Sequence, residues 1–239
     1  MINIKNLKKS FAIGFFKKNI DVIKDISFDV NPNEIFAFVG PNGAGKTTTL
    51  KMITGLITPD SGSITIDGID SKDIKSRRNL GYLPEISYYY NNLTGAEILD
   101  FYASLYGLTG KNKHDKVKLW LEKVGLKDAA NKTASKFSKG MLQRLGLAQA
   151  LIADPQIVIL DEPQSGLDPI GRRDVMNIIR DAKNNGQTIL FSSHILHDVE
   201  KISDRIAIIK NGKIAALGTI EEIMKSTGDL EQFFVKETL

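Results

Sequence analysis

Two clusters of residues in this chain have the types and spacing needed to bind a nucleoside triphosphate and its metal ion. In the first, residues 40–47 read GPNGAGKT, which fits the phosphate-loop pattern G-x-x-x-x-G-K-[ST] in full. Glycines let successive backbone N–H groups point at phosphate oxygens, and a helix beginning near Lys46 adds its positive dipole end. We expect the Lys46 ammonium to reach the β- and γ-phosphates and the Thr47 hydroxyl to bind Mg²⁺. The predicted nucleotide-binding residues here are Gly40, Pro41, Asn42, Gly43, Ala44, Gly45, Lys46, Thr47 and the adjacent Thr48.

The second cluster supplies the carboxylates that a metal-bound triphosphate requires. The stretch IVILDEP places Asp161 and Glu162 after four apolar residues, a pattern typical of a strand buried on both faces. Ligands of open α/β sheets bind at the carboxyl ends of the strands, where these acids fall. We expect Asp161 to hold Mg²⁺ through water, and Glu162 to polarise the water that attacks the γ-phosphate. The alternative, two acids that merely end a strand, would suit the pair alone but not a chain with a complete phosphate loop.

A further feature is a second helix start that could receive an anion. In KFSKGMLQRLGLAQALI, residues 136–152, Ser138 can cap a helix and Gly140 removes a side chain that would block close approach. One nucleotide cannot easily meet both helix starts of the same subunit, because each would lie against the γ-phosphate. Two copies facing each other head to tail solve this, so that ATP joins an isologous dimer. The alternative is an ordinary capped helix, which the serine and glycine alone would favour.

The elements that must position these residues alternate along the chain. Strand patterns occupy residues 2–11, 22–30, 34–40, 62–68, 157–163, 188–194 and 205–218. Helical patterns occupy residues 45–56, 94–108, 113–126, 138–152, 169–186 and 195–203. Strand, loop, helix and strand over residues 34–68 follow the βαβ order of a parallel sheet. The simplest account is an α/β sheet interrupted by an all-helical insertion.

At this point the residues resemble the ATP-binding cassette (ABC) family, whose signature motif reads L-S-G-G-Q-x-Q-R. Residues 137–144 read FSKGMLQR and match that motif at Ser138, Gly140, Gln143 and Arg144. They depart from it at Phe137, Lys139 and Met141. Lys139 replaces a glycine with a positive charge near a phosphate, which should not weaken binding. The resemblance covers nearly the whole chain, with every motif in the family's order.

The resemblance implies further site residues. SGLDP looks like the family's D-loop, with Asp168 at the dimer seam, although such a turn can also just start a helix. His194 looks like the switch histidine that contacts the γ-phosphate and orients the attacking water. One alternative is a structural polar residue that merely ends a strand. Another is a metal site made with His197 and Asp198, which only their spacing supports. GYLPE resembles the Q-loop, with Glu85 in place of the usual glutamine and still able to bind Mg²⁺. Phe11 is the expected adenine-stacking aromatic, with Phe15, Phe16 and plain core packing as alternatives.

The implied fold is a P-loop NTPase of the α/β class. It has a RecA-like core with a mixed sheet, an N-terminal antiparallel β subdomain and an inserted helical subdomain. Residues 1–239 would form one domain, with the nucleotide-binding core and β subdomain in 1–84 and 155–239 and the helical subdomain, which carries the signature, in 85–154.

The function implied is that of an ATP-hydrolysing subunit that drives a membrane permease. ATP and Mg²⁺ are the expected cofactors, and a second ABC ATPase subunit, identical or different, is one expected partner. Separate integral membrane permease subunits would hold the chain at the inner, cytoplasmic face of the cell membrane, and GYLPE with residues 91–107 looks more like exporter than importer subunits. A soluble ABC ATPase that acts on ribosomes or nucleic acid is one alternative. A P-loop kinase of a small molecule, with no use for Ser138, is another.

Composition excludes several other classes of function. The 239 residues are 42% hydrophobic and 25% charged, an ordinary globular composition. Cysteine is absent, so neither disulfides nor thiol chemistry are available. No apolar run approaches the roughly 20 residues that span a bilayer. Net charge is +4 and the basic pairs are scattered, so we expect no nucleic-acid partner.

Overall fold

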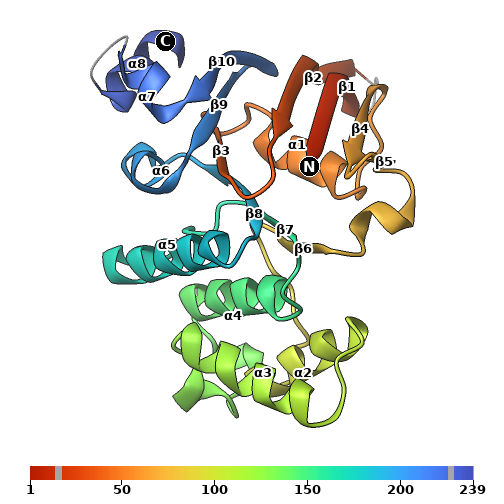
Figure 1. The fold of residues 1–239 in the computed structure, drawn as a ribbon, viewed down its shortest axis with the longest axis vertical. Coiled ribbons are helices and arrows are strands. Elements are labelled where there is room, and N and C mark those ends of the chain that lie inside the picture. Colours follow the sequence, from red (N-terminus) through yellow and green to blue (C-terminus); the bar gives the residue numbers. More distant parts are fainter. Residues whose placement is uncertain (14–17, 226–228, 239) are drawn as a thin grey trace.

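The computed structural model describes residues 1–13, 18–225 and 229–238, which form two sheets and a set of flanking helices (Figure 1). The strands are β1 (Ile2–Ile13), β2 (Lys18–Val30), β3 (Ile35–Val39), β4 (Ser61–Ile66), β5 (Ile69–Asp70), β6 (Leu80–Leu83), β7 (Ile157–Leu160), β8 (Thr188–Ser193), β9 (Arg205–Lys210) and β10 (Lys213–Thr219). The α-helices are α1 (Lys46–Ile53), α2 (Gly95–Leu105), α3 (Gly110–Lys123), α4 (Lys139–Leu151), α5 (Pro169–Asn184), α6 (Leu196–Ile202), α7 (Ile220–Lys225) and α8 (Leu230–Thr238). Short 3₁₀ turns occupy Ile74–Arg77, Lys127–Ala129 and Ala134–Lys136.

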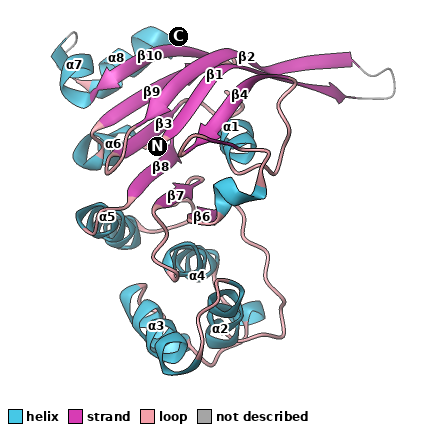
Figure 2. Ribbon diagram, turned by 45° about the vertical axis from the view of Figure 1, so that its right-hand side comes forward, coloured by secondary structure: helices cyan, strands magenta, loops and turns pink. Residues whose placement is uncertain are grey.

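The larger sheet is mixed and has the strand order β10-β9-β3-β8-β7-β6. Strands β9, β3, β8, β7 and β6 run parallel, and β10 is antiparallel to β9. The smaller sheet is antiparallel, with the order β2-β1-β4-β5, and lies beside the larger one (Figure 2). The α/β fold class with a mixed sheet and an N-terminal antiparallel sheet is therefore confirmed.

One expectation about connectivity was wrong. Strand β4 does not join β3 in a parallel βαβ unit but pairs antiparallel with β1, with Ile4 opposite Ile64. The physical reason is that both edges of β3 are already hydrogen-bonded, to β8 on one side and to β9 on the other. Helix α1 therefore connects the two sheets.

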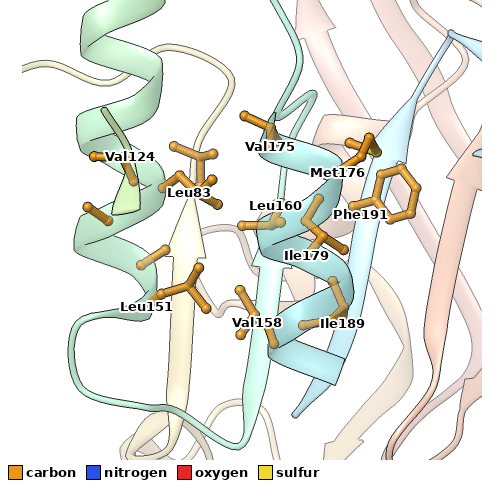
Figure 3. Packing of buried hydrophobic residues seen from close by; sticks show 14 of the residues in the cluster. Leu83, Val124, Leu151, Val158, Leu160, Val175, Met176, Ile179, Ile189 and Phe191 are labelled. Carbon is orange, nitrogen blue, oxygen red and sulfur yellow. The ribbon is translucent and has the colours of Figure 1, made fainter. Parts of the chain in front are cut away.

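The core is divided by the two faces of the larger sheet. Because side chains alternate along a strand, Ile35, Ala37 and Val39 of β3 face one hydrophobic cluster, and Phe36 and Phe38 face the other. The first cluster continues from β6, β7 and β8 onto α4 and α5 (Figure 3). In the second, Phe28 of β2 stacks on both phenylalanines at 5.4 and 5.3 Å between ring centroids, which joins the two sheets.

Three helices lie together at one end of the molecule. α2, α3 and α4 contact one another and form the lower part of Figure 1, with α4 nearest to β6 and β7. α2 starts with a capping box in which Thr94 and Glu97 bond each other's backbone N–H groups. α3 ends before Gly125 and α5 before Gly186, and both glycines have the positive φ that suits the end of a helix. Phe233 and Phe234 of α8 pack against the first cluster.

Within the described ranges 1–13, 18–225 and 229–238, each helix is too short or too polar to cross a lipid bilayer.

Candidate active site

The candidate site lies where four neighbouring parallel strands end. β3 leads into the phosphate loop, β8 into His194, β7 into Asp161 and Glu162, and β6 into Glu85. The order β3-β8-β7-β6 in the sheet places these ends side by side. Residues that are more than 100 positions apart in the chain, such as Thr47 and Asp161, therefore come into direct contact.

The phosphate loop depends on glycine at two positions where another residue would collide. A Cβ added to Gly40 would lie 2.4 Å from the carbonyl oxygen of Ile209. Gly45 has φ +111°, and a Cβ there would lie 2.4 Å from Cδ1 of Ile23. The left-handed conformation of Gly45, at the N-cap of α1, lets the loop turn into the helix without steric cost.

The Lys46 side chain is held inside this loop. Its Nζ donates to the carbonyl oxygen of Gly40 at 2.6 Å and to that of Pro41 at 3.3 Å. The same ammonium forms an ion pair with Oε1 of Glu162 at 3.3 Å, and Lys46 is only 7% exposed. A positive charge is thus fixed inside the phosphate loop.

Asp161 is fully buried, and one of its oxygens is well bonded. Oδ1 accepts from the hydroxyl of Ser192 at 2.7 Å and from that of Thr47 at 3.1 Å. Burial, together with the negative charges of Glu85 and Glu162, raises the pKa of Asp161, and the two hydroxyl hydrogen bonds oppose this rise. Oδ2 is buried and has no hydrogen-bond partner among the described residues.

These oxygens fit a magnesium site. Mg²⁺ prefers oxygen ligands and usually binds one or two protein groups together with water and phosphate oxygens. Thr47 and Asp161 present such oxygens in contact with each other, and the second carboxylate oxygen of Asp161 needs a partner. A bound Mg²⁺ at this position would neutralise charge on the triphosphate.

Glu162 has an unusual backbone conformation that other side chains hold in place. Its φ of +49° lies in the left-handed region, which is strained for a residue with a side chain. Its N–H donates to Oγ of Ser192 at 2.8 Å, and its carbonyl oxygen accepts from Nε2 of Gln143 at 3.1 Å. The Glu162 carboxylate is thereby aimed at Lys46 through Oε1 and at His194 through Oε2, which lies 2.8 Å from Nδ1.

These side chains surround a cavity of about 540 Å³. It is lined by Val22, Asn42, Gly43, Gly45, Lys46, Thr47, Thr48, Glu85, Glu162, Ser165 and His194. The sequence interpretation had missed Val22 and Ser165. Ser165 could have been found as the first residue of SGLDP, whereas nothing in the sequence marks Val22, an apolar residue of β2. Gly40, Pro41 and Ala44 lie in the loop but do not line the cavity, and Asp161 lies buried behind Thr47.

The signature residues are placed elsewhere. Ser138 caps α4, accepting a hydrogen bond from the N–H of Met141 at 3.2 Å. A Cβ on Gly140 would lie 3.1 Å from Cδ2 of Leu167, so this glycine also allows α4 to approach the turn after β7. Among the residues that the structure describes, none of α4 lines the cavity around Lys46.

Two other predicted residues have contacts within their own chain. Gln143 is 4% exposed, and its amide bonds the Glu162 backbone. Asp168 caps α5, because its Oδ1 accepts from the N–H of Gly171 at 2.8 Å. Asp168 itself is exposed, so capping leaves one carboxylate oxygen available at the surface.

The expected adenine contact is not part of the cavity wall. Phe11 lies on β1 opposite Ile20, with the Lys9 ammonium 5.4 Å from the ring centroid. Phe15 and Phe16 lie outside the described residues.

Metal ligands do not converge around His197. No group of three or more His, Cys, Asp or Glu side chains could hold a metal ion within the part of the chain that the structure describes. Asp198 accepts a hydrogen bond from Nε2 of Gln164 at 3.0 Å.

Comparison with known proteins places this site in a family. The family described as ABC transporter matches residues 23–165. The chain is 44% identical over 223 residues to the uncharacterized ABC transporter ATP-binding protein YxlF of Bacillus subtilis (strain 168), covering 93% of this chain and 72% of that protein. It is 36% identical over 230 residues to the linearmycin resistance ATP-binding protein LnrL of the same organism, covering 95% and 72%.

A solved structure shows the same likeness over the full length. The structure titled "Structure of ATP binding subunit of ABC transporter" superimposes with a TM-score of 0.87 and 32% identity, and the match covers 99% of both chains. Family, relatives and site geometry agree. The chain therefore belongs to the ABC transporter family, as an ATP-binding and ATP-hydrolysing subunit that drives transport.

Proposed function

We propose that two ABC subunits, of which this chain is one, close head to tail around two ATP molecules and so drive export through a permease. The observation that carries this proposal is that Ser138 lies apart from the cavity that would bind the nucleotide. The cavity gathers Lys46, Thr47, Glu162 and His194, while Ser138, at the start of α4, does not line it. A partner's Ser138 and Gly140 can complete the cavity, because an exposed helix start offers N–H groups to the γ-phosphate.

The residues in and around the cavity that the sequence predicted have proposed roles in hydrolysis. The phosphate-loop N–H groups and Lys46 hold the phosphates, while Thr47, Asp161 and Glu85 hold Mg²⁺. Glu162 accepts a proton from the attacking water, and His194, bonded to Glu162 at 2.8 Å, orients that carboxylate and contacts the γ-phosphate. Gln143 positions Glu162 through its backbone. Asp168, exposed at the start of α5, lies at the dimer seam.

The nature of the transport is inferred from surfaces and relatives. LnrL is named as a resistance protein, which favours export. We propose that residues 85–154 form a helical subdomain that contacts the permease beside Glu85, where Tyr88 and Tyr90 are 85% and 76% exposed. The chain would then lie at the cytoplasmic face of the membrane. An aromatic residue that stacks on adenine would come from β1 or the segment after it, with Phe11 as the candidate.

The alternatives make different predictions. A small-molecule kinase would transfer phosphate to an acceptor and release none to water. A soluble ABC ATPase would co-purify with ribosomes or nucleic acid, whereas the proposed function requires a membrane permease in the same extract.

The head-to-tail arrangement can be tested by cross-linking, because the chain contains no cysteine. Asn42 lines the cavity and is exposed, so a Ser138→Cys/Asn42→Cys variant should form disulfides between two chains when ATP closes the dimer. Mild oxidation with ATP and EDTA should give a covalent dimer on a non-reducing gel.

The control pairs Ser138→Cys with Lys72→Cys, an exposed residue in the turn between β5 and the 3₁₀ turn Ile74–Arg77. On the same non-reducing gel, this control pair and each single variant should run as a monomer. A covalent dimer that forms equally well without ATP, or none with it, would contradict the sandwich.

A further inference from the structure

A second pocket, of about 600 Å³, lies between α5 and α6 and is strongly cationic. Arg172, Arg173 and Arg180 reach it from α5, and Lys201 reaches it from α6. Both helices follow directly from loops of the active site: α5 is capped by Asp168, and α6 begins at Leu196, just after His194. The pocket therefore adjoins the catalytic loops, although its lining residues differ from those around Lys46.

The four positive charges are not fully neutralised within the chain. None of them forms an ion pair with any residue that the structure describes, whereas Arg205 pairs with both Asp29 and Glu34. Nε of Arg172 is buried without a hydrogen-bond partner among the described residues. Asp198, the one acid among the described residues of the lining, accepts from the neutral amide of Gln164 and offsets one of the four positive charges. Like charges that line one pocket repel one another, and a bound anion would relieve that repulsion.

Residue choice favours an oxyanion such as phosphate. Arginine is scarce in this chain, at seven of the 32 Lys and Arg residues, yet three of the seven line this pocket. Its planar guanidinium can donate two parallel hydrogen bonds to one phosphate, which a lysine ammonium cannot do. A merely solvated basic surface would have no need of arginine in place of the lysine used elsewhere.

Part of the pocket lining is apolar. Pro169 and Met176 of α5 line the pocket together with Ile195 and Ile202 of the α6 segment. A small inorganic anion would leave this surface uncovered. We propose that the pocket between α5 and α6 binds a phosphate-bearing molecule with an apolar body, such as a soluble phosphate ester or a phospholipid headgroup with its glycerol backbone. Such a ligand bridges the two helices that carry Asp168 and His194 at their starts.

Binding can be measured with naphthyl phosphate, whose fluorescence reports its environment. A Lys46→Ala background weakens the competing phosphate loop, and about 150 mM NaCl screens non-specific attraction. One equivalent should bind, and naphthol, which lacks the phosphate, should not. Adding Arg173→Gln and Arg180→Gln, both at exposed positions, should weaken binding at least about tenfold, because two charge-assisted contacts are lost.

The matched control removes two charges elsewhere. Lys72→Gln/Lys75→Gln alters exposed lysines outside the pocket and should leave affinity within about twofold. A single Arg180→Lys variant keeps the charge and tests the guanidinium itself, so it should still weaken binding several-fold. Equal affinity in the arginine and lysine double variants overturns the proposal.

The source of the phosphate is distinguished by a second measurement. Flotation with phosphatidic acid vesicles that depends on Arg173 and Arg180 assigns a lipid, and naphthyl phosphate binding without flotation assigns a soluble ester. Failure of both overturns the site. These assays need neither dimer nor turnover, so their result is independent of the ATP sandwich.

Discussion

Oε1 of Glu162 lies 3.3 Å from Nζ of Lys46, and both side chains are buried. The pair joins the end of β7 to the phosphate loop, while the other Glu162 oxygen contacts His194. A buried carboxylate that is held through both of its oxygens is well oriented, which suits a general base. Phosphate oxygens that approach Lys46 must share its ammonium with Glu162.

We therefore expect Glu162→Gln to separate binding from turnover. The amide cannot accept a proton from water, and it no longer repels the γ-phosphate or pairs with Lys46. Phosphate release should fall by at least about 100-fold, the usual contribution of a general base, while ATP affinity is retained or increased. Millimolar ATP with Mg²⁺ should trap a dimer, visible by size-exclusion chromatography with light scattering.

The control for this variant is Glu221→Gln, at an exposed acid of α7. It should hydrolyse ATP at the normal rate and show no trapped dimer. A Glu162→Gln protein that stays monomeric at millimolar ATP would contradict the sandwich but not ATP binding itself.

Asp161→Asn should weaken Mg²⁺ binding without lowering the stability of the fold. Because burial raises the pKa of Asp161, the folded state holds its proton more tightly than the unfolded state does. The free energy of unfolding then falls as pH rises from the ordinary pKa of 3.8 through the raised value, and the ionised carboxylate destabilises the fold at neutral pH. Asparagine removes that charge and can still accept from Ser192 and Thr47.

Thermal unfolding near neutral pH tests this expectation. Without Mg²⁺, Asp161→Asn should unfold at or above the temperature of the parent protein. The free energy of unfolding of the parent protein should rise by about 2.7 kcal/mol when ATP with Mg²⁺ is present at 100 times its Kd. The part of this rise that depends on Mg²⁺ should be absent in the variant. A variant that is markedly less stable without Mg²⁺ would show that the carboxylate contributes to folding in some other way.

Local motifs allowed much of the site to be predicted. The phosphate loop, Asp161 and Glu162 each follow a short apolar strand, so periodicity and turn residues located them directly. Contacts between distant segments could not be read this way. The sequence did not indicate β6, because LGYL is only four residues long and contains a glycine. The fold requires that glycine, since a Cβ on Gly81 would lie 1.9 Å from the carbonyl oxygen of Ala150.

Strand pairing and the roles of residues that contact distant segments could not be predicted from the sequence either. The order of strands decides that β4 pairs with β1 rather than β3, and no local pattern encodes that choice. Ser192 was overlooked within FSSH because its importance comes from two contacts, one with Asp161 and one with Glu162. Val22 lines the cavity only because β2 passes beside the phosphate loop.

Ser192→Ala should lower both stability and turnover. The Ser192 hydroxyl accepts the N–H of Glu162 and donates to Asp161, and the residue is fully buried. Leaving that N–H without a partner should cost about 1–3 kcal/mol in the free energy of unfolding by urea. Since Glu162 has a strained φ, weaker support should reduce kcat more than it changes the Kd for ATP.

An exposed serine provides the comparison. Ser104→Ala removes a hydroxyl of α2 that bonds Asp100 and Lys113 at the surface, and should change stability by less than about 0.5 kcal/mol. Equal losses of kcat and ATP affinity in Ser192→Ala would indicate general damage to the site rather than a positioning role.

Gly146→Ala sets helix propensity against packing. Gly146 lies in the middle of α4, where alanine should stabilise an isolated helix by about 0.5–1 kcal/mol. In the fold, however, its Cβ would lie 2.5 Å from Cδ1 of Leu83 and 2.9 Å from Oγ of Ser87. Leu83 is fully buried at the end of β6 (Figure 3), so it cannot move aside. Overpacking of this kind costs about 1–3 kcal/mol, and we therefore expect net destabilisation.

A double-mutant cycle separates these two effects. Leu83→Ala alone should cost about 2–5 kcal/mol because it leaves a cavity. Adding Gly146→Ala to it should cost much less than in the parent protein, because the nearer of the two colliding atoms is gone and only the Ser87 hydroxyl remains close. Urea unfolding of the four proteins gives the coupling free energy. Since Leu83 immediately precedes Pro84 and Glu85, the single Gly146→Ala variant should also displace Glu85 and lower Mg²⁺-dependent ATP turnover. Additive effects of the two substitutions would mean that α4 and the Glu85 segment do not contact each other closely enough to be coupled.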